Sequence, residues 1–264
     1  AIAGAVLSGC AQIPTVSVVL PIHGRGFFRA LDSALGQSVA PAEIILVYSA
    51  GQDETLTQVR RTYTEAISSG LLRILPSIGT GYALACNTAL EAARGELIAY
   101  LDGDCHWRQD YLKLMTAWFA QNDDLATGYA GGRRGMIRPG RPHAWGTPYD
   151  RAALLQEQTI DLSTYMHRRS VSDQLGGFDE DLGCCAAWDL ILRQTAVYAP
   201  GYLGFVGADV VRDLTETGSE HARHDTQARH RQDRWRHGLE APRIAYVLWD
   251  WPALSQSFVM AELE

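Results

Sequence analysis

The chain has 264 residues, of which 47% are hydrophobic and 20% charged, a composition typical of a soluble globular protein with one large domain or two modest ones. Its net charge of −7 lacks the basic excess of a nucleic-acid-binding surface, and no stretch reaches the ~20 apolar residues of a membrane span. Five cysteines, an odd number without metal-ligand spacing, indicate a reducing compartment. We therefore expect a cytoplasmic protein, free or at the inner face of the membrane, with no nucleic-acid partner.

Strand and helix patterns alternate through the first hundred residues. Short apolar, β-branched runs predict strands over 15–22, 43–48, 71–75 and 96–101. Amphipathic segments between them predict helices over 26–37, 53–68 and 81–95. This alternation predicts βαβ units and an α/β fold, with an open, mostly parallel twisted sheet flanked by helices. In such sheets, ligands bind beyond the carboxyl ends of the strands.

Two aspartates, Asp102 and Asp104, directly follow the strand expected over 96–101. Carboxylates this close repel each other unless a cation lies beside them, and Mg²⁺ or Mn²⁺ prefers such oxygen ligands together with substrate phosphates. The alternative is an ordinary solvated turn, because Asp and Gly are common turn residues. We favour a metal-diphosphate site, since residues 21–24 and 48–51 end at the same edge of the predicted sheet.

The regular alternation stops after a helix expected over 109–121. Residues 131–148 carry four arginines among glycines and prolines, which predicts a mobile loop. Its arginines are suited to closing over a diphosphate, or they are simply solvated. Further along, we expect a strand, a helix and a Gly-Gly turn within 159–182, a helix over 186–198, and a polar helix or tail over 225–238.

Three blocks together resemble a family 2 glycosyltransferase of the GT-A fold, over roughly residues 14 to 215. They are TVSVVLPIHGRGFFRALDSALGQSVAPAEIILVYSAGQDET, GELIAYLDGDC and MHRRSVSDQLGGFDEDLGCCAAWDLILR. The resemblance implies a GT-A domain over 14–240, with a Rossmann-like nucleotide-sugar half (14–104) and an acceptor half (105–240). It also implies an inverting transfer of sugar from a UDP-, GDP- or dTDP-sugar to a saccharide or lipid-linked acceptor, in polysaccharide or glycoconjugate synthesis.

The resemblance also assigns roles to individual residues. It implies that the donor is bound by Pro21, His23, Arg25, Tyr48, Asp102 and Asp104. It implies that the acceptor side is shaped by Gly177, Phe178, Asp179 and Trp188. The implied cofactor is Mn²⁺ or Mg²⁺, held by Asp102 and Asp104 and, in many relatives, by a histidine that His221 would supply here. A surface histidine without a ligand role is the alternative for His221.

Three positions depart from the family pattern. Tyr48 stands where the family has an aspartate that reads the base, which leaves the nucleotide open. Cys86 replaces an arginine expected near the phosphates. Ala186-Ala187 replaces the Glu-Asp pair whose aspartate is the general base. Asp189, or an acid within 179–181, would then supply the base; alternatively, Asp189 balances a helix dipole.

These departures leave other functions open. One alternative is a catalytically impaired GT-A domain that binds nucleotide-sugar or glycan for a neighbouring transferase; another is a nucleotidyltransferase on the same kind of sheet. The segment within 241–264, PRIAYVLWDWPALSQSFVMAELE, resembles the opening of a family 4 glycosyltransferase of the GT-B fold. It implies an adjacent transferase domain; otherwise it is a strand and helix that pack on the main domain.

Overall fold

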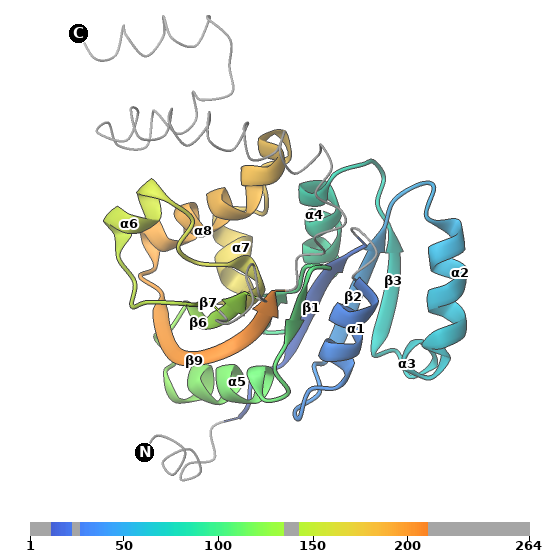
Figure 1. The fold of residues 1–264 in the computed structure, drawn as a ribbon, viewed down its shortest axis with the longest axis horizontal. Helices are drawn as coiled ribbons and strands as arrows, with labels where there is room; N and C mark the ends of the chain where they lie inside the picture. Colours follow the sequence, from blue (N-terminus) through green and yellow to red (C-terminus); the bar gives the residue numbers. More distant parts are fainter. Residues whose placement is uncertain (1–11, 23–26, 135–142, 211–264) are drawn as a thin grey trace, which may run out of the picture.

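The computed structural model describes residues 12–22, 27–134 and 143–210 (Figure 1). The strands are β1 (Val16–Pro21), β2 (Glu43–Tyr48), β3 (Leu72–Pro76), β4 (Leu97–Tyr100), β5 (Cys105–Trp107), β6 (Thr127–Arg134), β7 (His143–Trp145), β8 (Tyr165–Arg168) and β9 (Gly201–Val210). The α-helices are α1 (Phe27–Leu35), α2 (Asp53–Thr62), α3 (Thr64–Ser68), α4 (Tyr82–Ala92), α5 (Tyr111–Gln121), α6 (Arg151–Gln156), α7 (Arg169–Leu175) and α8 (Ala186–Val197). Two 3₁₀ segments, η1 (Leu162–Thr164) and η2 (Glu180–Cys185), complete the described elements.

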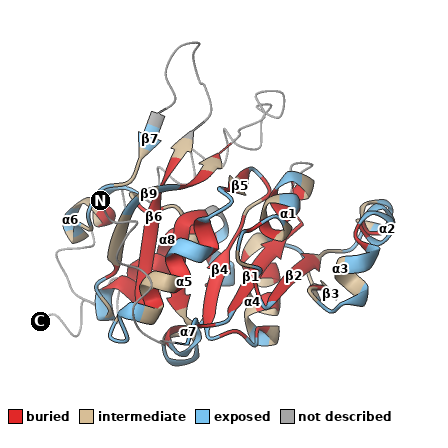
Figure 2. Cartoon of the chain, turned by 90° about the horizontal axis from the view of Figure 1, so that it is seen from below, coloured by how far each residue is buried: buried red, intermediate tan, exposed pale blue. Residues whose placement is uncertain are grey.

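The first half of the chain confirms the predicted parallel α/β sheet. Strands β1 to β4 pair in the order β3-β2-β1-β4, and every pairing is parallel. Val18 lies between Ile44 of β2 and Ala99 of β4, and all three side chains are fully buried. Strands β1, β2 and β4 are buried on both faces because α1 covers one face and α4 the other, which explains their continuous apolar runs (Figure 2).

The helix predicted over 53–68 is divided at Tyr63, where the backbone leaves helical geometry between α2 and α3. The Tyr63 hydroxyl donates to Oδ1 of Asp32 at 2.7 Å, and its ring stacks on Phe28 with the centroids 6.4 Å apart. A tertiary contact with α1 therefore interrupts the continuous pattern that the sequence shows.

The prediction of a mobile loop over 131–148 is wrong for its described part. Residues 127–134 form β6, and β7 pairs antiparallel with its end, with Gly132 opposite Trp145. A Cβ atom at Gly132 would lie 2.1 Å from the Trp145 ring, so glycine allows this close strand pairing. The glycines that suggest a loop in the sequence are thus required by the sheet; residues 135–142 lie outside the described ranges.

The sheet continues past β4 as a mixed sheet, in the order β4-β8-β6-β9-β5. β8 runs antiparallel to both of its neighbours, whereas β6 and β9 are parallel. Strands β4 and β5 are consecutive in the chain, yet β8, β6 and β9 lie between them in the sheet. The sheet therefore curls, and the short segment 101–104 connects strands from its two halves.

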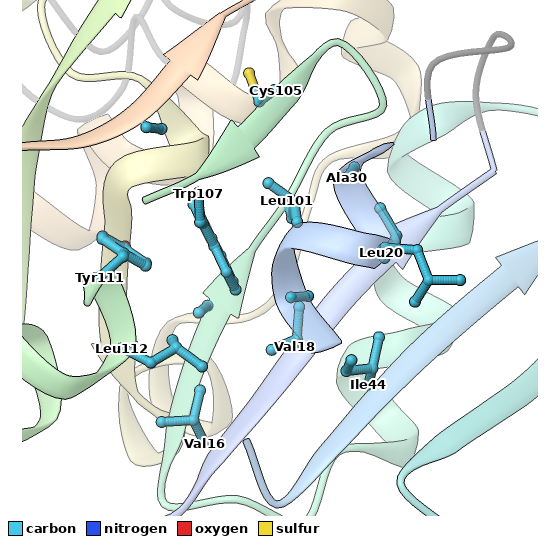
Figure 3. Close-up of a cluster of buried hydrophobic side chains, with 14 of the residues drawn as sticks. Val16, Val18, Leu20, Ala30, Ile44, Leu101, Cys105, Trp107, Tyr111 and Leu112 are labelled. Atoms are coloured by element: carbon cyan, nitrogen blue, oxygen red, sulfur yellow. The ribbon is translucent and has the colours of Figure 1, made fainter. Parts of the chain in front are cut away.

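Side chains from both halves close this curl in one core (Figure 3). Trp107 of β5 and Leu101 after β4 pack in the same cluster as Val18 and Leu20 of β1. The Trp107 amide also donates to Oγ of Ser33 in α1 at 3.0 Å. The segment that carries the two aspartates is thus held from both sides by buried neighbours. Within the described ranges, no helix is both long and apolar enough to cross a membrane.

Candidate active site

The Asp102-Gly103-Asp104 turn lies directly beyond the buried end of β4. The amide of Cys105 donates to the Asp102 carbonyl at 3.0 Å, which closes the turn, and Oδ1 of Asp102 accepts from the Gly103 amide at 2.7 Å. Asp104 is exposed, and its Oδ1 accepts from the Cys105 thiol at 3.3 Å. The structure therefore brings both predicted carboxylates together at one edge, with Asp102 half-buried and Asp104 open to solvent.

The electrostatics of this turn favour a bound cation. Burial, with the negative charge of Asp104 adding to it, raises the pKa of Asp102 to about 7 from the usual value of 3.8, although the Gly103 amide opposes the shift. A divalent cation beside the two carboxylates would favour their ionised forms and reverse this effect. Both groups supply the hard oxygen donors that Mg²⁺ and Mn²⁺ prefer, so the residues fit the predicted metal.

A third carboxylate, Asp161, was not anticipated from the sequence. Its Oδ1 accepts from the Ser163 amide at 2.9 Å at the start of η1, and the Trp107 indole donates to the Ser163 carbonyl at 2.6 Å. Its negative charge contributes to the raised pKa of Asp102 and, after burial, to that of Cys105. The sequence shows only a local Asp-x-Ser capping pattern, which indicates nothing about the distance to Asp102.

The described side chains include no group of three or more His, Cys, Asp and Glu that could hold a metal ion. Predicted ligand His221 lies outside the described residues. Asp102 and Asp104 would then be joined by phosphate oxygens and water, which complete the coordination of Mg²⁺-type ions in many nucleotide sites.

The predicted donor residues are partly described. Pro21 ends β1 and is buried, and Tyr48 ends the neighbouring strand β2 and is half-buried. His23 and Arg25 lie outside the described residues. The register of β1 and β2, with Pro21 opposite Val47, places the Pro21 and Tyr48 ends at the same edge of the sheet.

Gln52 links these two strand ends, a role that the sequence did not reveal. Its Oε1 accepts from the Ser49 amide at 2.8 Å, and its Nε2 donates to the Ile22 carbonyl at 3.1 Å. One side chain thus fixes the backbone that follows β1 to the backbone that follows β2. Gln52 therefore orients the loop in which Tyr48 would meet a base.

Asn87 of α4 holds the predicted acceptor turn. Its Oδ1 accepts from the Phe178 amide at 2.7 Å, and its Nδ2 donates to the Phe178 carbonyl and to Oε1 of Glu180, both at 2.9 Å. A Cβ atom at Gly177 would lie 2.4 Å from Oδ1 of Asn87, so this approach requires glycine. Phe178 is buried and meets Tyr100 edge-on at 5.4 Å between centroids, which connects the acceptor turn to β4.

Of the remaining residues predicted on the acceptor side, one lies on the surface and one in the interior. Asp179 is exposed, and its Oδ1 accepts from the Asp181 amide at 3.0 Å at the start of η2. Trp188 is buried in α8, and its indole donates to the Leu154 carbonyl at 2.9 Å. The structure therefore places Asp179 where a ligand can reach it and Trp188 in the packing beneath.

Asp189, the predicted catalytic base, lies in the interior. It is 1% exposed, and its Oδ2 accepts from Nε of Arg193 at 2.8 Å. Arg193 also donates to the carbonyls of Leu175 and Gly177, at 2.9 and 2.5 Å. The ion pair thus fastens the Gly-Gly turn to α8.

Cys86 occupies the position where a cation was expected near the phosphates. The thiol is fully buried, and burial, with the charge of Asp102 adding to it, raises its pKa well above the usual value. A neutral thiol therefore lies near the aspartate turn. Ala186 and Ala187 begin α8, so no carboxylate projects from the first two positions of that helix.

Comparison with known proteins agrees with this geometry. Residues 17–175 match the family described as Glycosyl transferase family 2, so the chain belongs to this family. A chondroitin synthase of Pasteurella multocida (strain Pm70) is 30% identical over 124 residues, which cover 46% of this chain and 12% of that protein. The chain thus spans about an eighth of the length of that relative.

Two solved structures share the fold. Staphylococcus aureus TarS 1–349 in complex with UDP-GlcNAc has a TM-score of 0.64 at 16% identity, covering 78% of this chain and 61% of TarS. The mannosyltransferase PcManGT from Pyrobaculum calidifontis, in complex with GDP-Man and Mn²⁺, has a TM-score of 0.62 at 19% identity, covering 95% of this chain and 79% of that one. The predicted GT-A fold is confirmed; the relationship to a family 4 domain concerns residues outside the described ranges.

Proposed function

We propose that this domain transfers a sugar, with inversion, from a nucleotide-sugar to a saccharide or lipid-linked acceptor in polysaccharide or glycoconjugate synthesis. The observation that carries the proposal is the Asp102-Gly103-Asp104 turn, where a half-buried carboxyl with a pKa of about 7 lies beside an exposed one at the end of β4. Such a pair is suited to a divalent cation and a diphosphate, and membership of glycosyl transferase family 2 supports the same assignment.

In this proposal, the nucleotide lies along the ends of β1 and β2. Tyr48 stacks on the base, held by the loop that Gln52 fixes to Ile22. A tyrosine ring stacks on any base, so UDP-, GDP- and dTDP-sugars all remain candidates, and His23 and Arg25 are proposed to contact the phosphates. The residues 14–104 then form the donor half and 105–240 the acceptor half.

Asp104 would hold Mn²⁺ or Mg²⁺ directly, with Asp102 beside it and His221 proposed as a further ligand. When bound, the metal stabilises the negative charge that develops on the departing nucleoside diphosphate. The role of the protein is to keep the two carboxylates in place. On one side of the turn, the Cys105 amide and the buried cluster around Trp107 hold the carboxylates. On the other side, β4 holds them.

The chemical step requires a base for the acceptor. The acceptor hydroxyl oxygen forms the new bond to the anomeric carbon, the bond to the diphosphate oxygen breaks, and the hydroxyl proton passes to a base. We propose that one of the exposed acids Asp179, Glu180 and Asp181 takes this proton. Asp189, buried against Arg193, would instead position the acceptor turn.

A catalytically impaired domain is the second candidate, favoured by Ala186-Ala187 and by the buried ion pair of Asp189. It would bind the same donor and serve a neighbouring transferase. The resemblance of residues 242–264 to a family 4 glycosyltransferase is the reason for proposing such a neighbour. It predicts donor binding without turnover.

Calorimetry with UDP-GlcNAc, GDP-Man and a dTDP-sugar, with and without Mn²⁺, tests the proposal. We expect metal-dependent binding of at least one donor, lost in Asp104→Asn and retained in the matched control Asp124→Asn, which alters another exposed aspartate. Failure of all donors to bind would overturn both candidates. Binding followed by release of nucleoside diphosphate with acceptor would support the transferase; binding without any turnover would support the impaired domain.

A further inference from the structure

A second charged cluster lies at the end of the sheet opposite β3. Arg133 of β6, Asp209 of β9 and His106 of β5 are register partners across three adjacent strands. Arg108 follows β5 directly, and its amide donates to the Gly207 carbonyl at 2.8 Å. We call these four residues the Arg108–Arg133 cluster.

Both arginines share the carboxylate of Asp209. Nε of Arg133 lies 2.7 Å from Oδ1, and Nε of Arg108 lies 2.8 Å from Oδ2. Nη2 of Arg108 also reaches Oδ1 at 3.2 Å. The Asp209 side chain is 13% exposed, whereas the side chains of Arg108 and Arg133 are 44% and 42% exposed. The carboxylate is therefore covered, and the guanidinium groups reach solvent.

The cluster carries more positive charge than Asp209 can balance. Two guanidinium groups meet one carboxylate, and His106 lies 3.8 Å from the same oxygen as Arg108. Among the described side chains, neither arginine forms an ion pair with another acid. In a chain of net charge −7, this is a local excess of positive charge. Each guanidinium has five N–H donors, so several remain for a planar or tetrahedral oxyanion.

A role in holding neighbouring strands together does not account for this excess of positive charge. One arginine would suffice to neutralise Asp209 and to join β9 to its neighbour. The second arginine adds a cation that repels the first, a cost that a bound anion offsets. The arrangement is therefore that of an anion site, in which Asp209 orients two exposed guanidinium forks.

The position of the cluster identifies which substrate would carry the anion. Asp104 directly precedes β5, and His106 is the second residue of that strand, so the cluster adjoins the aspartate turn along the chain. In the proposed function, the diphosphate of the donor occupies the aspartate turn, and the nucleotide lies toward β1 and β2. The cluster lies on β5, β6 and β9, in the acceptor half.

We propose that the Arg108–Arg133 cluster binds an anionic group, a carboxylate or a phosphate, carried by the acceptor saccharide. This inference rests on the proposed function, because it names the acceptor chemistry of the same site. It makes the cluster a determinant of acceptor specificity that is separate from the metal site.

Three oligosaccharides serve as probes: one that ends in glucuronic acid, its carboxyl-reduced counterpart that ends in glucose, and that neutral chain carrying a 6-phosphate. We expect the full chain to bind at least one anionic probe about 10-fold or more tightly than the neutral one, as for charge-assisted bidentate pairs. Arg108→Gln and Arg133→Gln should bring this ratio close to one, and Arg133→Lys should retain part of it. Arg60→Gln, an exposed arginine of α2, is the matched control and should retain all of it.

The proposal is overturned if the anionic and neutral probes bind equally, or if the ratio survives both glutamine variants while their melting temperatures match the unaltered chain. Titration of UDP with Mn²⁺ separates the two substrates: the glutamine variants should leave its affinity unchanged, and a loss of more than about 5-fold would assign the cluster to the donor. Asp104→Asn should abolish UDP binding and leave oligosaccharide binding intact. Failure of the donor site is therefore distinguishable from failure of the anion site.

Discussion

The Tyr100 hydroxyl lies 2.7 Å from Nε2 of His167 in the fully buried interior between β4 and β8. Nδ1 of His167 lies 2.8 Å from the Arg168 carbonyl, which only accepts, so Nδ1 carries the proton and Nε2 accepts from Tyr100. Both nitrogens are thereby occupied in the neutral ring. Burial lowers the pKa of His167 to about 4, although the Arg168 carbonyl opposes the shift.

This neutral histidine predicts a loss of stability in mild acid. The unfolded chain takes up a proton near the ordinary pKa of 6.5, and the folded chain does so only near 4. The contribution to stability is therefore present above pH 6.5 and is lost as the pH falls toward 4, by about 3 kcal/mol. Urea unfolding at pH 7 and pH 4.5 measures it. His167→Gln should have a smaller pH dependence than the unaltered chain.

Replacement of Asp104 by asparagine should lower kcat/KM for the donor by about 10²-fold or more, because a preorganised charge at the diphosphate is removed. The exposed side chain makes only one described hydrogen bond, to the Cys105 thiol, so the melting temperature should stay within a degree or two. Initial rates over a range of donor concentrations at saturating Mn²⁺, compared with Asp124→Asn, measure the effect. Equal activity of the two variants would remove Asp104 from the catalytic site.

Gly177→Ala should destabilise the domain by about 1–3 kcal/mol. The new methyl would lie 2.4 Å from Oδ1 of Asn87, so at least one of the Asn87–Phe178 hydrogen bonds would be lost. Gly204→Ala is the matched control, because its Cβ meets only Tyr202, at an ordinary 3.7 Å. Denaturant midpoints give both values. Similar midpoints for the two variants would show that Asn87 does not fix the acceptor turn.

Asp189→Asn separates a positioning role from a catalytic one. Loss of the buried carboxylate leaves Arg193 without its counter-charge, and we expect about 2–4 kcal/mol of destabilisation, since Arg193 is 23% exposed. Asp173→Asn, which alters an exposed pair with Arg169, should cost less than about 0.5 kcal/mol. Because Arg193 holds the acceptor turn, KM for the acceptor should rise more than kcat falls. A drop in kcat beyond 10³-fold with unchanged stability would make Asp189 the base after all.

The sequence predicted those strands whose hydrophobic pattern matches their burial in the folded domain. β1, β2 and β4 are buried on both faces, so each shows a continuous apolar run, and the same pattern places Asp102 and Asp104 at a strand end. β6 lacks this pattern. Its sequence, TGYAGGRR, is rich in glycine because Trp145 lies against Gly132 and Trp118 against Gly128, and both tryptophans belong to other elements.

In the candidate site, too, the sequence does not reveal roles that depend on contacts outside a residue's own element. Asp161, Gln52 and Arg133 act through neighbours that are far away in sequence, and no periodicity encodes those distances. The resemblance implied an acceptor turn at Gly177 and Phe178, which stays a prediction, and burial decides whether a residue there can meet a ligand. Asp189 shows this, since its carboxylate lies in the interior beside Arg193.

The curl of the sheet has a consequence for the order of folding. β5, which follows the aspartate turn, finds its hydrogen-bonded neighbour in β9, where Cys105 pairs with Val210 more than a hundred residues later. β1 to β4 can pair as soon as the first hundred residues are available, but this second flank of the turn must await the chain up to β9. Contacts of such sequence separation form slowly. During synthesis, the aspartate turn would therefore be among the last parts of the domain to gain its final rigidity, after most of the interior has formed.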